Sequence, residues 1–221
     1  MLVTFTDRHG GKSQGVYSSL NLGDHVGDSS ADVSHNRQVL EALHGPVQFM
    51  NQVHGNRIAI IEAVSGQPPT ADALITGISG ITLAVMVADC IPLLLTSREV
   101  VAAVHVGRRG LVNQVAVKTI EIMREMGGRA ISATIGPAIC GSCYEVSADV
   151  HQEVISEFPL ADSRTRTGSL ALDLPRALAD VLQSSGVSIN PALSRCTVED
   201  SDLFSYRRDG VTGRQAGLVR L

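Results

Sequence analysis

The stretch ITLAVMVADCIPLLL, residues 81–95, constrains the fold of this chain more than any other. It is the most apolar segment, but it is shorter than the roughly 20 apolar residues that a bilayer-spanning helix needs, and it contains an Asp. Apolar runs at 81–87 and 91–95 flank a break at Asp89 and Cys90. The pattern predicts two strands separated by this break.

Similar runs rich in Val and Ile predict further strands at 57–63, 100–106 and 130–135. Helices are predicted at four places, which are 31–45, 111–128, 147–158 and 173–186. Ser147 and Asp173 are the expected N-caps of the last two helices. Glycines end three of the helices, at Gly45, Gly127–Gly128 and Gly186. In the second helix, the expected apolar face consists of Leu111, Val115, Ile122 and Met126.

The order of these elements indicates the fold class. Strands and helices do not alternate regularly, and no G-x-G-x-x-G follows a first strand, which disfavours a Rossmann domain. We therefore predict an α+β fold, a mixed α/β sandwich with β-sheets flanked by helices. No linker rich in Pro, Gly or Ser interrupts the chain, so residues 1–221 are expected to form a single domain. The segment RHGGKSQGVYSSLNLGDHVGD, residues 8–28, is expected to form turns with exposed polar groups and little core.

Charge and composition bear on partners and location. The net charge is −4, there is no Trp, and no basic stripe is present, which disfavours nucleic-acid binding. The first residues lack a basic region followed by an apolar run, so they do not indicate a secretory signal. We expect a cytoplasmic protein without a membrane partner. Its four Cys are then expected to be thiols or metal ligands rather than disulfides.

Three potential metal ligands, His54, Cys90 and His105, occur where predicted strands meet turns. Side chains at such strand ends can converge on one rim. Two His and one Cys suit Zn²⁺ and leave a fourth position open for water or substrate. Two alternatives remain: the three side chains are structural, or Cys90 is a nucleophile with His54 or His105 as its base. A metal-bound thiolate is not a free nucleophile, so the zinc and nucleophile hypotheses exclude each other while metal is bound.

A second Cys pair, Cys140 and Cys143 in CGSC, has the C-x-x-C spacing of redox enzymes and zinc ribbons. It has no second C-x-x-C to accompany it, so we expect neither Cys to be essential for catalysis. The sequence contains no G-x-S-x-G, P-loop or H-E-x-x-H motif.

Several blocks together identify a resemblance that covers the chain end to end. The chain resembles the YfiH-like family, also called the laccase-domain or multicopper polyphenol oxidase family. The N-terminal and central blocks are FTDRHGGKSQGVYSSLNLGDHVGD, NRQVL, NQVHG, ADALIT, ADCIPLLL and VAAVHVGRRG, and the closing blocks are IGPAICGSCYEV and CTVEDSDLFSYRRDGVTGRQAGL. The chain departs from the family at Arg108, where the family usually has Trp, and this change bears on base stacking or substrate range.

The resemblance implies a mixed α/β sandwich and a zinc site made of His54, Cys90 and His105. It also implies purine nucleoside chemistry: phosphorolysis of adenosine, inosine and methylthioadenosine, and deamination of adenosine. Purine nucleosides and phosphate are then the partners. The alternatives are an amidase that edits a peptidoglycan precursor, low-level copper-dependent polyphenol oxidase activity, and a non-catalytic zinc-stabilised binding protein. The seven His include no H-x-H pair, so a multicopper centre is not expected, and copper at the same ligands would be adventitious.

Phosphorolysis requires a held phosphate, and guanidinium groups bind phosphate bidentately. The expected phosphate or substrate anchors are Arg8, Lys12, Arg37 and Arg109, and Gln52 is expected to bind substrate or fix the loop of His54. Asp89 is expected to orient a ligand or carry a proton. The block SYRRDGVTGR adds further charged residues, which are Arg207, Arg208, Asp209 and Arg214. Deamination requires an activated water, and zinc lowers the pKa of a bound water toward ~7.

Overall fold

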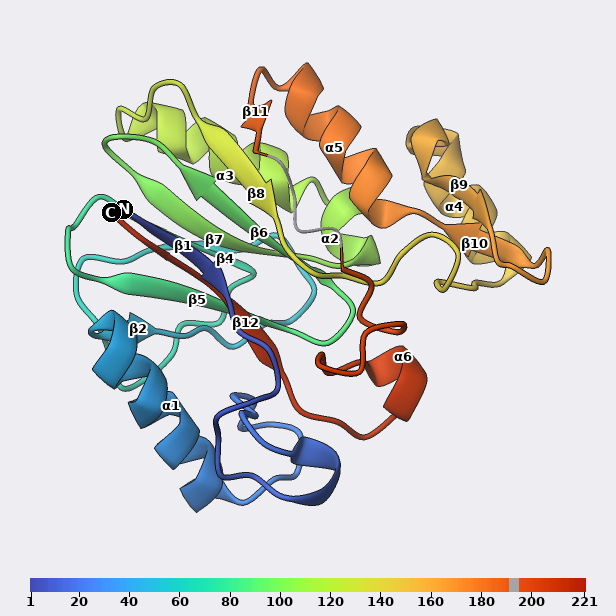
Figure 1. Ribbon diagram of the computed structural model, residues 1–221. Coiled ribbons are helices and arrows are strands. Elements are labelled where there is room, and N and C mark those ends of the chain that lie inside the picture. Colours follow the sequence, from blue (N-terminus) through green and yellow to red (C-terminus); the bar gives the residue numbers. More distant parts are fainter. Residues whose placement is uncertain (191–194) are drawn as a thin grey trace.

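Two β-sheets that face each other form the centre of the computed structural model, which describes residues 1–190 and 195–221 (Figure 1). The four-stranded sheet has the order β1 (Leu2–Phe5), β12 (Gln215–Arg220), β5 (Thr82–Val87) and β2 (Val47–Gln48). The six-stranded sheet has the order β11 (Ser188–Ile189), β8 (Ser132–Ile135), β6 (Ile91–Thr96), β7 (Val101–Val106), β4 (Ala73–Thr76) and β3 (Ile58–Ile60). A separate hairpin pairs β9 (Asp162–Arg164) with β10 (Leu170–Leu172). The predicted mixed α/β sandwich is confirmed.

Helices cover the outer face of each sheet. The α-helices are α1 (Ser30–His44), α2 (Arg108–Val112), α3 (Val115–Glu125), α4 (Ala148–Glu157), α5 (Leu174–Ser184) and α6 (Tyr206–Asp209). Two short 3-10 helices are η1 (Gly15–Tyr17) and η2 (Pro159–Ala161). In Figure 1, α1 lies beside the four-stranded sheet, whereas α3 and α5 lie on the far side of the six-stranded sheet. The layers therefore run helix, sheet, sheet, helix, with an apolar core between each pair of layers.

This layering explains the apolar runs of the sequence, because the central strands are buried on both faces. In β5, Leu83 and Val85 face the other sheet, while Ala84 and Met86 face α1 and the N-terminal segment. All six residues of β5, β6 and β7 are buried in each strand. The side chains of β7 alternate between the inter-sheet core and the core under the helices.

The predicted helix caps are confirmed in two cases. The Ser147 hydroxyl accepts from the Val150 N–H at 3.5 Å, and the Asp173 carboxylate accepts from the Arg176 N–H at 3.0 Å. The helix predicted near the N-terminus also ends as expected, because Gly45 is its C-cap with a φ of 74°.

The prediction of one continuous helix over 111–128 is wrong. The helix is interrupted at Gln114, whose φ of 58° lies in the left-handed region and separates α2 from α3. The buried side of α3 also differs from the predicted face, because Ile122 and Met126 are only partly buried. The buried side of α3 consists of Val115, Ala116, Thr119, Ile120 and Met123.

The segment 8–28 is mostly irregular, as expected, but the prediction that its polar groups are exposed is wrong in part. Ser13 and Asn21 are fully buried. The Ser13 hydroxyl donates to Asp28 at 2.6 Å, and the Asn21 amide donates to the same carboxylate at 2.8 Å. Asn36 of α1 completes this network by donating to Ser13. Buried polar side chains require such partners, so the segment is fixed against α1 rather than loosely held.

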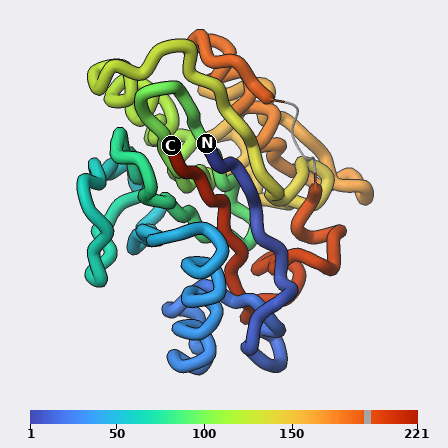
Figure 2. Tube along the Cα trace, turned by 60° about the vertical axis from the view of Figure 1, so that its left-hand side comes forward, coloured from blue at the N-terminus to red at the C-terminus, as the bar shows by residue number. Residues whose placement is uncertain are grey.

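The strands near the two ends of the sequence lie side by side (Figure 2). β1 pairs antiparallel with β12, and Leu2 faces Arg220 in the register. β12 in turn pairs with β5, so it lies between two strands that precede it by long stretches of chain.

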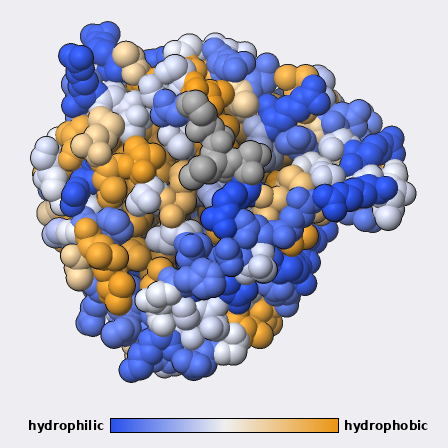
Figure 3. All heavy atoms as spheres, in the orientation of Figure 1, coloured by the Kyte–Doolittle hydropathy of each residue, from blue (hydrophilic) through white to orange (hydrophobic). Residues whose placement is uncertain are grey.

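On the face shown in Figure 3, apolar groups gather on the side of the termini, and polar side chains dominate elsewhere. None of the helices described here combines the length and the apolar character that crossing a bilayer requires.

Candidate metal and substrate site

His54, Cys90 and His105 meet at one end of the sandwich. Their donor atoms all lie within 4.8 Å of one another. The Cys90 Sγ is 3.9 Å from the His54 Nε2, and the two imidazole rings meet edge to face with centroids 4.7 Å apart. The convergence of these side chains, predicted from their strand-end positions, is confirmed.

The register of the six-stranded sheet explains how these side chains meet. His105 follows Val101 and Ala103 on the face of β7 that points toward the other sheet. Cys90 lies one residue before β6, whose Pro92 pairs with His105. His54 lies in the loop before β3 and has a φ of 57°, in the left-handed region. The site is therefore formed by one strand end, one turn between strands and one loop.

Asp72 fixes both histidines and was not identified from the sequence. Its side chain is fully buried, and one oxygen lies 2.9 Å from the His105 Nδ1. The same carboxylate accepts backbone N–H groups of Val53, His54 and Gly55, the last at 2.7 Å. An Asp at the start of a buried strand, in the block ADALIT, was the available signal. The carboxylate directs the Nε2 of His105 toward Cys90, an arrangement common around metal-binding histidines.

The electrostatics favour a thiolate at Cys90. Burial raises the pKa of the thiol, but the charge of His105 and hydrogen bonds from both histidines outweigh burial and lower the pKa to about 6. For His105, burial lowers the pKa, but the Cys90 thiolate and the Asp72 carboxylate raise it to about 9. A thiolate beside imidazoles is a donor set that a borderline divalent cation binds well.

The three side chains open into a cavity of about 410 Å³, a size within the usual range of small-molecule sites. Its lining residues are His25, Gln52, His54, Met86, Val87, Ala88, Asp89, Cys90, His105, Ile139, Tyr144, Tyr206, Arg207 and Arg214. The cavity thus combines metal-binding groups, aromatic and aliphatic walls, and two guanidinium groups.

Both arginines of the cavity retain free donors. The Nη1 of Arg214 donates to the carbonyl oxygens of Thr212 and Gly213, and among the described residues its other guanidinium nitrogens have no acceptor. The Nη1 of Arg207 donates to the carbonyl oxygen of Glu145. The remaining guanidinium nitrogens of Arg207 also have no acceptor within residues 1–190 and 195–221. Burial lowers the pKa of Arg214, whereas Cys90 and Asp89 oppose this shift. Guanidinium stays charged in proteins, so the cavity offers two cations with unused donors.

Two residues singled out in the sequence also line the cavity, and hydrogen bonds hold both of their side chains in place. The amide of Gln52 accepts from the Met86 N–H at 2.9 Å and donates to the Met86 carbonyl at 2.7 Å. Gln52 therefore ties the loop of His54 to β5. The Asp89 carboxylate accepts from the hydroxyls of Thr197 and Ser205 and from the Arg207 N–H, each at 2.6 Å.

Four other expected anchors lie outside the lining of this cavity. Arg8 stacks over Phe204, and its Nε donates to the Ser18 carbonyl at 2.7 Å. Arg37 stacks over Phe49 and donates to the Leu22 carbonyl. Lys12 is exposed.

Arg109 is exposed on α2 and does not line the cavity. Its neighbour Arg108, at the position of the family Trp, forms an ion pair with Glu153 of α4 at 3.1 Å. Sequence reasoning did not assign Tyr144 to the site, although it lies in the block IGPAICGSCYEV. The Arg207 guanidinium lies over the Tyr144 ring, 5.1 Å from its centroid.

Comparison with known proteins shows extensive similarity. A family model described as "Multi-copper polyphenol oxidoreductase laccase" matches residues 2–221. A purine nucleoside phosphorylase from Corynebacterium glutamicum is 44% identical over 98% of this chain and 93% of its own length. One from Streptomyces coelicolor is 42% identical over 98% of this chain and 94% of its own.

Solved structures agree with the fold. The protein NMB0706 of Neisseria meningitidis superposes with a TM-score of 0.90 at 38% identity, covering 98% of this chain and 92% of that one. YlmD of Geobacillus stearothermophilus also gives a TM-score of 0.90, at 33% identity, covering 99% and 91%.

Proposed function

The chain belongs to the multi-copper polyphenol oxidoreductase laccase family, as its sequence blocks indicated, and on that premise we propose that it is a zinc-dependent purine nucleoside phosphorylase. Its substrates would be phosphate and adenosine, inosine or methylthioadenosine. The observation that carries this proposal is a cavity that combines the His54, Cys90 and His105 set with two arginines, each of which has guanidinium nitrogens without an acceptor among the described residues. The names of the curated relatives support it.

The donor set fits zinc. Two imidazoles and one thiolate leave a fourth position, as in catalytic zinc sites, and the Asp72 carboxylate orients one ligand from behind. Bound zinc would supply Lewis acidity at the edge of the substrate cavity.

The residues of the chain account for the requirements of phosphorolysis. A phosphate oxygen bonds to C1′ of the ribosyl group as the bond from C1′ to the base nitrogen breaks, and the proton of hydrogen phosphate balances the proton that the departing base takes up. Arg207 and Arg214 bind the phosphate, because a guanidinium offers paired donors to two of its oxygens. Ile139, Met86 and Tyr144 supply apolar and aromatic surface for the purine. Asp89 acts as a positioning residue through its hydrogen bond to the Arg207 N–H.

We propose deamination of adenosine as a second activity of the same cavity. It replaces the amino group of the base with oxygen from water and releases ammonia, and it needs no phosphate. Only phosphorolysis should therefore depend on Arg207 and Arg214. The cytoplasmic location and the single-domain organisation over residues 1–221 stay predictions of the sequence.

The test measures products from adenosine with and without phosphate. We expect ribose-1-phosphate and adenine with phosphate, inosine without it, and loss of both reactions on chelation with recovery on adding Zn²⁺. Arg214→Gln should raise the KM for phosphate while phosphate-free deamination continues. Arg109→Gln, on an exposed residue outside the cavity, is the matched control. Absence of ribose-1-phosphate from the zinc-loaded protein would overturn the proposed phosphorylase.

The proximity of Cys90 to His54 favours one rival, a Cys–His amidohydrolase acting on a peptidoglycan precursor. Such an enzyme would keep its activity in chelator and lose it on alkylation of Cys90. Polyphenol oxidation is the other rival, and it would require added copper. Restoration of phosphorolysis by Zn²⁺ but not by Cu²⁺ would separate zinc chemistry from both.

A further inference from the structure

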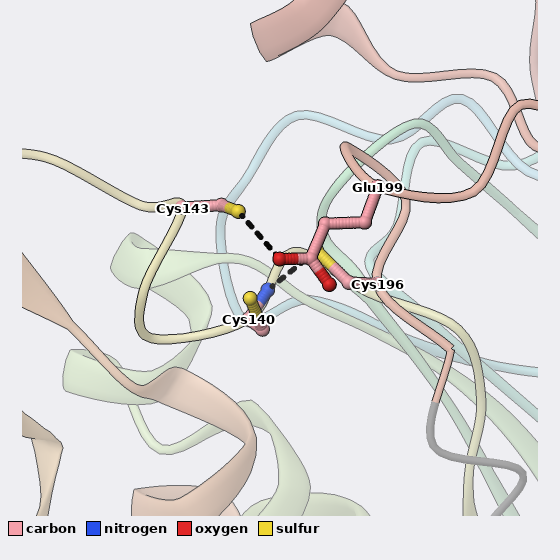
Figure 4. Close-up of side chains that lie close together, drawn as sticks. All are labelled: Cys140, Cys143, Cys196 and Glu199. Carbon is pink, nitrogen blue, oxygen red and sulfur yellow. Dashed lines mark hydrogen bonds between the residues drawn. The ribbon is translucent and has the colours of Figure 1, made fainter. Parts of the chain in front are cut away.

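A second cluster of metal-binding side chains lies outside the substrate cavity. Cys140, Cys143, Cys196 and Glu199 place a donor atom each within 4.8 Å of all the others. Figure 4 shows the three sulfur atoms and the Glu199 carboxylate turned toward one another. We infer that these four residues bind a second zinc ion, which has a structural role.

Two tight turns, Cys140–Cys143 and Cys196–Glu199, each supply two of the four ligands. In the turn after β8, the Cys143 N–H donates to the Cys140 carbonyl at 3.0 Å. In the other turn, the Glu199 N–H donates to the Cys196 carbonyl at 3.2 Å. Each turn therefore presents two ligands three residues apart, as zinc-binding turns do. The C-x-x-C pair is therefore accompanied by a C-x-x-E motif, CTVE, at residues 196–199, rather than by a second C-x-x-C.

One distance already matches a tetrahedral zinc site. The Cys143 Sγ lies 3.5 Å from the Glu199 Oε1. Zinc bonds of about 2.3 Å to sulfur and about 2.0 Å to oxygen, at the tetrahedral angle, place these two ligands about 3.5 Å apart. The remaining pairs, within 4.8 Å, need only small side-chain movements to close around one ion.

The surroundings suit an anionic ligand set. The Cys140 N–H donates to the Cys196 Sγ at 3.4 Å, and Arg166 forms an ion pair with the Glu199 carboxylate. Such contacts orient metal ligands and offset the negative charge of several thiolates. All four cysteines of the chain are free thiols in this structure. Four protein ligands leave no open position, which distinguishes this set from the three-ligand set at Cys90.

The position of the cluster gives it a structural consequence. Ile139 and Tyr144, which flank the Cys140–Cys143 turn, both line the substrate cavity. The Ile139 N–H donates to the Asp89 carbonyl at 2.9 Å, while Thr197, beside Cys196, donates to the Asp89 carboxylate. An ion at the cluster would join two segments that each contact the turn of Cys90.

The experiment uses the full chain with Cys90→Ser, which leaves the three cysteines of the cluster as the remaining thiols. We expect this protein to bind one Zn²⁺ tightly, and the ion to protect all three thiols from alkylation. Co²⁺ in place of Zn²⁺ should give the intense visible and thiolate charge-transfer absorption of a tetrahedral thiolate site. Adding Cys143→Ser should abolish stoichiometric binding.

Glu199→Gln in the same background tests the fourth ligand without removing a cysteine. It should weaken zinc binding, whereas Glu145→Gln, an exposed Glu two residues from Cys143, should not. Less than one zinc in folded Cys90→Ser protein, or zinc that leaves the three thiols reactive, would overturn the inference. A Cys140–Cys143 disulfide in protein purified without air would also overturn it, in favour of a redox pair.

Discussion

Replacing Asp72 with Asn tests whether one buried carboxylate supports the proposed zinc site at His54, Cys90 and His105. One oxygen of Asp72 accepts hydrogen bonds from the His54 N–H and the His105 Nδ1, each at 2.9 Å, and the other accepts from the Gly55 N–H at 2.7 Å. An Asn offers only one acceptor oxygen in the same volume. Its best placement keeps the first two partners and turns the NH₂ group toward the Gly55 N–H.

The cost follows from these contacts. A buried donor without an acceptor costs about 1–3 kcal/mol, and a hydrogen bond to a charged group contributes about 1 kcal/mol more than one to a neutral group. The two retained bonds lose the charge of their acceptor and the third bond is lost, so the free energy of unfolding should fall by about 3–5 kcal/mol. Because His105 is no longer held by a carboxylate, zinc affinity should fall by about 10–100-fold.

The assay combines urea unfolding of metal-free protein with zinc competition against a chromophoric chelator. Metal-free protein is needed for unfolding because bound metal adds its own stabilisation. Asp28→Asn is the matched control: its carboxylate accepts from Ser13, Asn21 and the Ser29 N–H but lies outside the substrate cavity. It should lower stability and leave zinc affinity unchanged. A folded Asp72→Asn protein with the wild-type zinc affinity would refute the reasoning.

Three further predictions address packing around the site. In Gly107→Ala, the new Cβ would lie 3.0 Å from the Cys90 Sγ and 3.3 Å from a His54 ring carbon, so zinc affinity should fall in the competition assay. The control is Gly66→Ala, whose new Cβ would have no atom within 4 Å and which should leave zinc affinity unchanged. Leu94→Ala removes a fully buried side chain between the sheets and should lower the free energy of unfolding by about 2–5 kcal/mol, measured in urea. Asp89→Asn weakens the contact that holds the Arg207 backbone, so steady-state kinetics should show a larger rise in KM for phosphate than for nucleoside; an equal rise in both would contradict this role.

The convergence of His54, Cys90 and His105 was predictable because each residue carries a local signal, a His or Cys where an apolar run meets a turn. The central strands were also predictable, since burial on both faces leaves continuous apolar runs. Asp72 was missed because its role depends on the pairing of β4 with β7, which places it opposite His105.

Long-range contacts account for the remaining differences. Arg207 and Arg214 reach the cavity from the other end of the chain, and no local pattern relates them to His54. The second cluster pairs Cys140 with Cys196, 56 residues later. The break at Gln114 was not predicted, because a residue other than Gly, Asn or Asp rarely adopts the left-handed backbone conformation that Gln114 has.

The place of β12 between β1 and β5 has a consequence for how the protein matures during synthesis. A chain emerging from the ribosome presents β1 at the outset and β5 well before its end, yet neither strand has its central neighbour until residues 215–220 have been translated. The turn of Cys90 directly follows β5, and Arg214 directly precedes β12. A nascent chain stalled before residue 214 can therefore carry His54, Cys90 and His105 and still lack the strand that joins β1 to β5 beside the turn of Cys90.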